Sequence, residues 1–285
     1  MPTTLARQAH RSLEPLHAFI YFAPEAEERF TKLGLEPRRM TYFAGRAAPM
    51  GAVGAGAVAA AFYNFNPEII ASALPRAWSI ASPADVVAAR FEAADTGLRR
   101  LLGDDVVASE PVVEAAQLAR EASAGCFPEG RPLYAAHADL EWPEAPHVVL
   151  WHAISLLREF RGDGHICALQ NAGLSGLEAL VLQISSGEGL SEEFAKLSRG
   201  WSDAQWDSAL AALRERGLLD ETNAPSEAGK EFRAELEART DQLDSAPWAR
   251  FDTGKEERLF DHCATLAKKL AKAGAFPREN FAAKK

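Results

Sequence analysis

The sequence predicts an all-α fold in which strands are limited to short hairpins. Apolar residues recur at helical spacing through nearly all of the 285 residues, and no run of alternating β-branched residues indicates a longer strand. Hydrophobic residues make up 47% of the chain, which is enough for a well-packed core. The hairpins are expected near Leu218 and near Leu102.

The N-terminal part contains several predicted helices. Residues 5–22 place leucine and isoleucine on one helical face, and Pro24 begins a second helix that ends at Gly34. Residues 50–65 are rich in alanine and glycine. Because these glycines lack the spacing of a phosphate-binding loop, we interpret them as positions where two helices pack closely. A further helix is predicted over residues 83–102.

Two apolar helices are predicted in the middle of the chain. The first runs from residue 146 to residue 160, and the second ends at Leu182. The segment Arg-Gly-Asp-Gly-His, residues 161–165, lies between them. Its two glycines relax the backbone and predict a turn.

The region from residue 191 to residue 243 predicts a winged helix-turn-helix, because its order is helix, turn, helix, short hairpin and long helix. Ser202 is the expected N-cap of the second helix, and Gly217 is the expected left-handed residue that ends it. Residues 218–225 would form the hairpin, or wing. Ser226 would cap the last helix.

Residues 212–221 and 226–240 resemble the MarR-type winged-helix family, in which a helix ending in Arg-Gly-Leu precedes a wing and a Thr/Ser-x-Ala-Gly sequence. Over roughly residues 10–250 the chain is also similar to a family of actinobacterial helix-turn-helix proteins. This second resemblance implies the fold and a bacterial cytoplasmic setting, but no activity. The segments that carry it are His17, Tyr21–Glu25, Tyr42–Pro49, Phe62–Pro67, Trp151–His152, Leu157–Glu159, Arg161–His165 and Ser198–Trp201.

Matching positions in the two halves of the chain indicate an internal repeat. Phe43 would correspond to Phe160, and Trp78 to Trp201, although the spacings differ. Such a repeat would give two winged-helix halves related by a pseudo-twofold axis. The predicted division is an N-terminal half (1–109), a linker (110–145), a C-terminal half (146–250) and a helical tail (251–285).

Composition limits the partners of the protein. A formal net charge of −9 disfavours general affinity for nucleic acid or an anionic membrane. The three cysteines are scattered, which gives no zinc spacing and indicates reduced thiols. No signal peptide or membrane-spanning stretch is recognised. These features predict a soluble cytoplasmic protein, either a monomer or a homodimer.

The second helix of the predicted helix-turn-helix has nearly balanced charges, and its wing has two acidic residues and no basic one. Reading DNA requires cationic and amide side chains against phosphates and base edges. The residues that could contact DNA are Ser202, Gln205, Arg214 and Arg216. We therefore expect any DNA binding to be weak and nonspecific.

Several polar residues beside apolar helical runs form the predicted ligand site. They are His17, Tyr42, Arg46, His152, Arg158, Asp163 and His165. Arginine can bind a carboxylate or phosphate through two hydrogen bonds, and Asp163 could orient His165. The structural alternatives are core histidines, ion pairs of the arginines with Asp163 and Glu159, and a helix cap at residues 161–165.

Two classes of function remain open. The first is a winged-helix protein that binds a small molecule between its halves, as a transcriptional regulator with weak or lost DNA binding would. The second is an enzyme, or a metal or haem protein, that uses His17, His152 and His165 with Asp163. No catalytic or metal-binding motif supports the second class, so it ranks lower, and no cofactor is identified.

Overall fold

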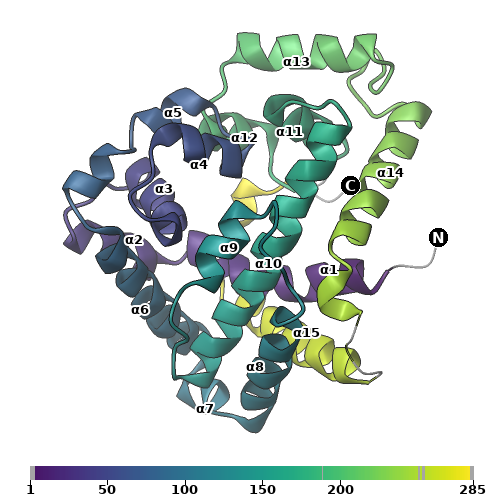
Figure 1. The fold of residues 1–285 in the computed structure, drawn as a ribbon. Coiled ribbons are helices and arrows are strands. Elements are labelled where there is room, and N and C mark those ends of the chain that lie inside the picture. Colours follow the sequence, from purple (N-terminus) through teal and green to yellow (C-terminus); the bar gives the residue numbers. More distant parts are fainter. Residues whose placement is uncertain (1–3, 188, 250, 252–253, 283–285) are drawn as a thin grey trace.

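Helix α10 (Pro146–Asn171) is the centre of the molecule and contacts α1, α8, α9 and α14 (Figure 1). A computed structural model describes residues 4–187, 189–249, 251 and 254–282. The other α-helices are α1 (Leu5–Ala18), α2 (Pro24–Lys32), α3 (Arg39–Ala47), α4 (Ala55–Phe62), α5 (Pro67–Ala71), α6 (Pro83–Leu102), α7 (Asp104–Val107), α8 (Glu110–Ser123), α9 (Pro132–Ala138), α11 (Gly176–Ser185), α12 (Glu192–Arg199), α13 (Asp203–Glu215), α14 (Glu227–Leu243) and α15 (Lys255–Lys272).

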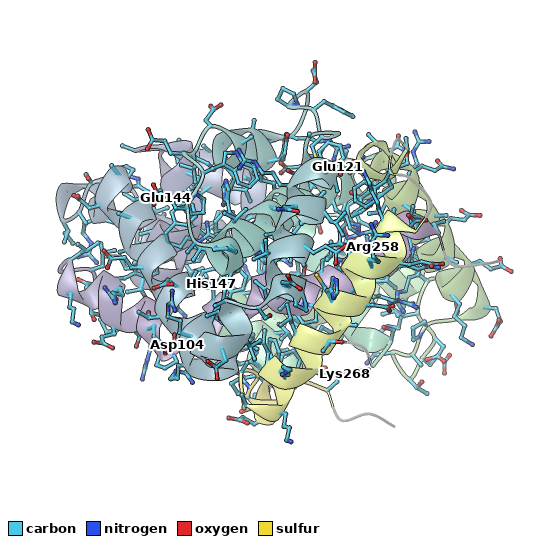
Figure 2. The ribbon with its side chains drawn as sticks, turned by 90° about the horizontal axis from the view of Figure 1, so that it is seen from below. Asp104, Glu121, Glu144, His147, Arg258 and Lys268 are labelled. Atoms are coloured by element: carbon cyan, nitrogen blue, oxygen red, sulfur yellow. The ribbon has the colours of Figure 1, made fainter. Side chains whose placement is uncertain are left out.

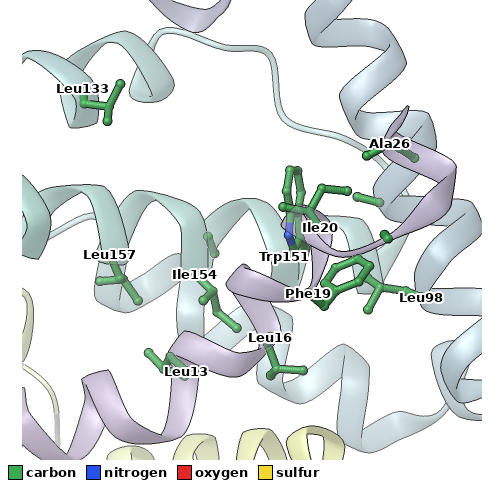
Figure 3. Close-up of a cluster of buried hydrophobic side chains, with 14 of the residues drawn as sticks. Leu13, Leu16, Phe19, Ile20, Ala26, Leu98, Leu133, Trp151, Ile154 and Leu157 are labelled. Carbon is green, nitrogen blue, oxygen red and sulfur yellow. The ribbon is translucent and has the colours of Figure 1, made fainter. Parts of the chain in front are cut away.

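The main hydrophobic core lies where α1 crosses α10 (Figure 3). Leu13 and Leu16 of α1 lie in this core with Ile154 and Leu157 of α10, and none of the four is more than 4% exposed. In each helix the two residues are three positions apart, so they share one face. Burying each of these side chains contributes about 1.5–3 kcal/mol to folding. This core fixes α1 against the middle of α10.

Helix α15 covers the underside of the molecule beside α8 (Figure 2). Leu259, Cys263 and Leu266 recur at intervals of four and three residues and are buried, whereas Lys268 is exposed. Residues 110–145, the expected linker, contain α8 and α9, and both helices contact α10. Among the described residues, no helix is long and apolar enough to cross a membrane.

The turn predicted at residues 161–165 is wrong, because these residues lie inside α10, which continues to Asn171. Gly164 serves packing instead. A Cβ atom at this position would lie 2.6 Å from Nη1 of Arg131 and 3.3 Å from Cβ of Leu243. The glycine therefore lets these neighbouring side chains approach α10 closely.

The all-α class is confirmed, with 72% of the residues helical, but the predicted β wings are wrong. No strand forms in the described ranges, and the segment after α13 has one isolated bridge, between Leu219 and Pro225. The bridge does not extend into a ladder, because the N–H of Leu218 donates to the carbonyl oxygen of Leu213 (2.9 Å) and Ser226 is already the N-cap of α14. Oδ1 of Asp220 accepts hydrogen bonds from the backbone N–H groups of Thr222 (2.8 Å) and Ala224 (3.0 Å), which closes a tight turn. At the second expected hairpin, α6 is followed at once by α7.

Helices α11, α12 and α13 form a layer at one end of α10, above the main core in Figure 1. They share a second hydrophobic core, in which Val181 of α11 and Trp206 and Leu213 of α13 are at most 1% exposed. Residues 200–202 join α12 to α13, and a short glycine-containing turn of this kind is typical of a helix-turn-helix. The order helix, turn, helix is thus present without wings.

Candidate functional site

A cavity of about 900 Å³ lies between α1, α3, α4, α10, α11 and the end of α12. Its volume falls in the range of sites for small organic molecules. Helix α10 lines it with Arg158, Gly162, Ile166 and Leu169, at the spacing of one helix face. Five residues of the predicted ligand site line this cavity: Tyr42, Arg46, Arg158, Asp163 and His165.

Glu159 joins two arginines on the cavity wall. Its Oε2 accepts hydrogen bonds from Nη1 of Arg158 at 2.8 Å and from Nη2 of Arg46 at 3.4 Å, and it is 1% exposed. Burial acts to raise the pKa of Glu159, but the positive charges of Arg158 and Arg46 outweigh it and hold that pKa well below its ordinary value. Arg46 and Arg158 therefore both form ion pairs with Glu159, which is the structural alternative given above for these arginines.

Glu14 of α1 is a second carboxyl group on this wall. Its Oε2 lies 3.6 Å from Nε of Arg158, within ion-pair range. Burial raises the pKa of Glu14. The neutral form of Glu14 is therefore favoured more than that of Glu159, which leaves Arg46 and Arg158 with one strongly ionised partner between them.

Arg199 differs from these arginines because it has no carboxylate partner among the residues that the structure describes. It is the last residue of α12 and lines the cavity. Its Nη1 donates to Oγ of Ser198 at 3.0 Å, and its guanidinium carbon lies 4.5 Å from the centre of the Phe65 ring. A guanidinium stays charged even though burial lowers the pKa of Arg199, so the cavity contains an uncompensated cation.

The end of α12 is held in place by the segment that follows α4. The backbone N–H of Asn66 donates to the carbonyl oxygen of Arg199 at 2.9 Å, and Nδ2 of Asn66 donates to that of Gly200 at 3.0 Å. Nε1 of Trp201 donates to the carbonyl oxygen of Asn64 at 3.0 Å. Since Asn64 also lines the cavity, these hydrogen bonds join the turn of the helix-turn-helix directly to the cavity wall.

Five buried polar atoms of the cavity-lining residues have no hydrogen-bond partner within the described part of the chain. They are Oε2 of Glu14, Nε of Arg46, Oδ1 of Asn64, Oε1 of Glu159 and Nε of Arg199. Unpaired buried polar groups are costly, so water or a ligand that pairs with them would stabilise this wall. Both donors belong to arginines and all three acceptors are oxygen atoms.

The aromatic side chains of the wall form one cluster. The ring of Tyr42 lies 5.6 Å from that of Tyr21 and 5.5 Å from that of Phe65, and Phe62 and Phe65 are 6.0 Å apart. These centroid distances are those of favourable ring contacts. The cavity wall thus combines an aromatic surface with the charged residues of α10.

Asp163 and His165 line the cavity, but Asp163 does not orient His165 as predicted, because each side chain bonds to another partner. Oδ2 of Asp163 accepts hydrogen bonds from the backbone N–H groups of Leu133 (3.0 Å) and Tyr134 (2.9 Å), so it caps α9. Nδ1 of His165 lies 2.9 Å from Oγ1 of Thr240 on α14. Each side chain therefore ties α10 to a neighbouring helix.

His17 and His152 lie outside the cavity wall. His17 is fully buried between Ser155 and Tyr21, whereas His152 packs between the rings of Phe91 and Trp142. The three histidines of the predicted enzyme site consequently face different surroundings. In the described ranges, no group of three or more histidine, cysteine, aspartate or glutamate side chains could hold a metal ion.

Among the wall residues that the sequence analysis did not assign to the site are Glu14, Tyr21 and Arg199. Tyr21 follows His17 by four positions, and this spacing could have indicated a side-chain pair at the end of α1. For Arg199, the sequence gives only its position before the helix-ending Gly200. That it faces a cavity depends on the Asn66 contacts, which local sequence does not encode.

The residues expected to contact DNA are all engaged within the chain. Oγ of Ser202 and Oε1 of Gln205 form the capping box of α13. Nη1 of Arg214 donates to Oδ1 of Asn223 at 2.6 Å. Nη1 and Nη2 of Arg216 donate to the carbonyl oxygens of Gly173 (2.9 Å) and Ala172 (3.1 Å), the two residues that follow α10.

The fold and the cavity together define a helical protein in which a helix-turn-helix closes one wall of an internal site. Comparison with known families agrees with this class, because the model of the Helix-turn-helix family matches residues 6–277. The chain belongs to this helix-turn-helix family. No curated protein and no solved structure matches the chain.

Proposed function

We propose that this helix-turn-helix protein binds an organic acid in the cavity. The observation that carries the proposal is Arg199, a cavity-lining cation without a carboxylate partner in the described residues. A planar guanidinium binds a carboxylate through two parallel hydrogen bonds, and Nε of Arg199 is buried and unpaired. An acid would therefore supply both the missing charge and the missing acceptor.

The rest of the wall favours an aromatic or otherwise apolar body on this acid. Tyr42, Phe62 and Phe65 line the cavity with aromatic carbon, and a flat apolar body would pack against it. Apolar walls with a few convergent polar groups are the usual composition of a small-molecule site. Benzoates, cinnamates and naphthoates combine these two properties and are suitable probes.

We further propose that the bound acid acts on the helix-turn-helix. A ligand held by Arg199 is held by the last residue of α12, next to the turn that leads into α13. If binding favours one position of this turn, α13 moves with it, because Trp206 and Leu213 fix α13 to the second core. The protein would then be a regulator whose DNA contact responds to an organic acid.

Direct DNA binding by α13 is expected to be weak and nonspecific. Asp203 and Asp207 are exposed on this helix, and carboxylates near phosphates reduce affinity. Fluorescence anisotropy with promoter fragments at about 0.15 M salt should show no sequence preference. Replacing both aspartates with asparagine should strengthen binding to all fragments equally. Tight, sequence-selective binding by the wild type would refute this expectation.

The ligand proposal is tested by calorimetric titration with a panel of aromatic carboxylates and the matching primary alcohols. The wild type should bind the acids at least tenfold more tightly than the alcohols, because an alcohol cannot form the charged hydrogen bond that a carboxylate forms with Arg199. Arg199→Gln should remove this preference. Exposed Arg39→Gln is the matched control and should retain it. If no acid binds, or if acids and alcohols bind alike, the proposal is wrong.

A further inference from the structure

A chain of three hydrogen bonds connects the interior of α10 to the cavity wall. Oγ of Ser155 donates to the carbonyl oxygen of Trp151, one turn earlier in α10, at 2.8 Å. Nδ1 of His17 lies 2.9 Å from the same Oγ, and Nε2 of His17 lies 2.8 Å from Oη of Tyr21. Ser155 and His17 lie outside the cavity wall, whereas Tyr21 lines it.

The chemistry of these groups fixes the direction of each hydrogen bond. A serine hydroxyl has one hydrogen, and a carbonyl oxygen can only accept. Ser155 therefore donates to Trp151 and cannot donate to His17 as well. It follows that Nδ1 of His17 carries a hydrogen and donates it to Oγ of Ser155.

The same reasoning extends to Tyr21. Burial holds the pKa of His17 well below its ordinary value, so the imidazole is neutral and carries only one hydrogen. Its Nε2 is consequently an acceptor, and the hydroxyl of Tyr21 must donate to it. Burial also raises the pKa of Tyr21, which keeps the phenol protonated. The single hydroxyl hydrogen of Tyr21 is thus already in use.

We infer that the Tyr21 hydroxyl can only accept a hydrogen bond from the ligand, so that the preferred acid also carries a hydroxyl or N–H group that donates to it. This inference rests on the proposed binding of an organic acid. It adds a second polar group to the ligand and assigns Ser155 and His17 as positioning residues that never touch it.

Neighbouring acceptors on the wall favour the same kind of ligand. Oδ1 of Asn64 and Oε1 of Glu159 are buried and accept no hydrogen bond from the described residues. A ligand with only acceptor groups would leave both unpaired. Tyr42, whose ring lies 5.6 Å from that of Tyr21, has no hydrogen-bond partner in the described part of the chain. Its hydroxyl can donate or accept, so it does not distinguish ligands in this way.

The test compares a hydroxylated naphthoate with its O-methyl ether by calorimetric titration. The methyl ether keeps the acid and the ring system but loses the donor. The wild type should bind the hydroxylated acid about tenfold more tightly, since the ether places an acceptor against an acceptor. Tyr21→Phe should remove this preference, and Tyr42→Phe, the matched control, should retain it.

Ser155→Ala separates the hydrogen-bond chain from simple contact. This variant changes no side chain of the cavity wall, but it removes the acceptor that holds the hydrogen of His17 on Nδ1. The imidazole can then donate from Nε2 to Tyr21, which frees the Tyr21 hydroxyl to donate to the methyl ether. The preference should therefore fall several-fold in Ser155→Ala as well.

The possible outcomes are distinct. If the wild type binds both compounds equally, or if the preference survives in Tyr21→Phe, the inference is overturned while the proposed function stands. A preference that is lost in Tyr21→Phe but unchanged in Ser155→Ala contradicts the assigned hydrogen-bond direction. If no naphthoate or other acid of the panel binds, the proposed function fails and the inference fails with it.

Discussion

Replacing Glu159 with glutamine is expected to lower the free energy of unfolding by about 3 kcal/mol, the size of effect seen when one partner of a buried ion pair is removed. Glu159 is 1% exposed and is the carboxylate that both Arg46 and Arg158 contact. The neutral amide would leave the buried guanidinium of Arg46 and the partly exposed one of Arg158 without their shared anion. Urea unfolding monitored by circular dichroism measures the change.

Two comparisons decide whether burial causes this loss. Glu36→Gln removes the carboxylate of an exposed pair with Arg76 and should change stability little, because exposed pairs are screened by water. The pKa of folded Glu159 lies below its ordinary value, so its contribution is complete above that value and is lost only as the pH falls through the folded pKa. The difference between wild type and Glu159→Gln should therefore be unchanged from about pH 7 to about pH 5. Equal losses in the two variants would contradict the ion-pair account.

Gly176→Ala is expected to destabilise the protein by about 3 kcal/mol, the upper part of the range for overpacking. Gly176 begins α11, and a Cβ atom there would lie 1.9 Å from the carbonyl oxygen of Tyr63 and 3.1 Å from Cα of Asn64. Because the obstacle is backbone, a side-chain rotation cannot relieve it. The helix layer would have to move away from the segment that also holds Arg199. Chemical denaturation should show the lower free energy of unfolding, and calorimetric titration should show weaker acid binding.

Gly56→Ala is the matched control for this substitution. Gly56 lies in α4, and nothing is within 4 Å of the position its Cβ would occupy. Alanine at an open helical position stabilises a protein by roughly 0.5–1 kcal/mol relative to glycine. Opposite signs for the two substitutions are therefore expected. If Gly176→Ala were as stable as Gly56→Ala, α11 would not abut the Tyr63 segment as described.

The helices could be predicted from the sequence because their end signals are local. The predicted caps Ser202 and Ser226 each accept a hydrogen bond from the first turn of their helix, as Asn66 and Ser82 do at α5 and α6. The turn at residues 161–165 was predicted wrongly because Gly164 serves close contacts with Arg131 and Leu243, which lie far from it in the sequence. The wings were predicted wrongly for a related reason: Leu218 and Leu219 have the composition of a strand, but the N–H of Leu218 bonds back to Leu213 and Ser226 already caps α14, so the pairing stops at the Leu219–Pro225 bridge.

The site could be predicted in its residue types and not in its pairings. Tyr42, Arg46 and Arg158 were expected to meet at a pocket because polar groups beside apolar helices are unusual, and they do line the cavity. Which carboxylate each arginine contacts depends on tertiary packing. Arg199 and Tyr21 gained their importance only from the arrangement of α12 and α1 around this cavity.

The central claim is that the cavity binds an organic acid through Arg199, and a crystal structure of the protein with the tightest-binding acid of the panel tests it most directly. The account predicts electron density for the acid between α1, α10 and the end of α12, with its carboxylate within hydrogen-bond distance of the Arg199 guanidinium. An acid bound on the outer surface, or one in the cavity with its carboxylate turned away from Arg199, would contradict the account.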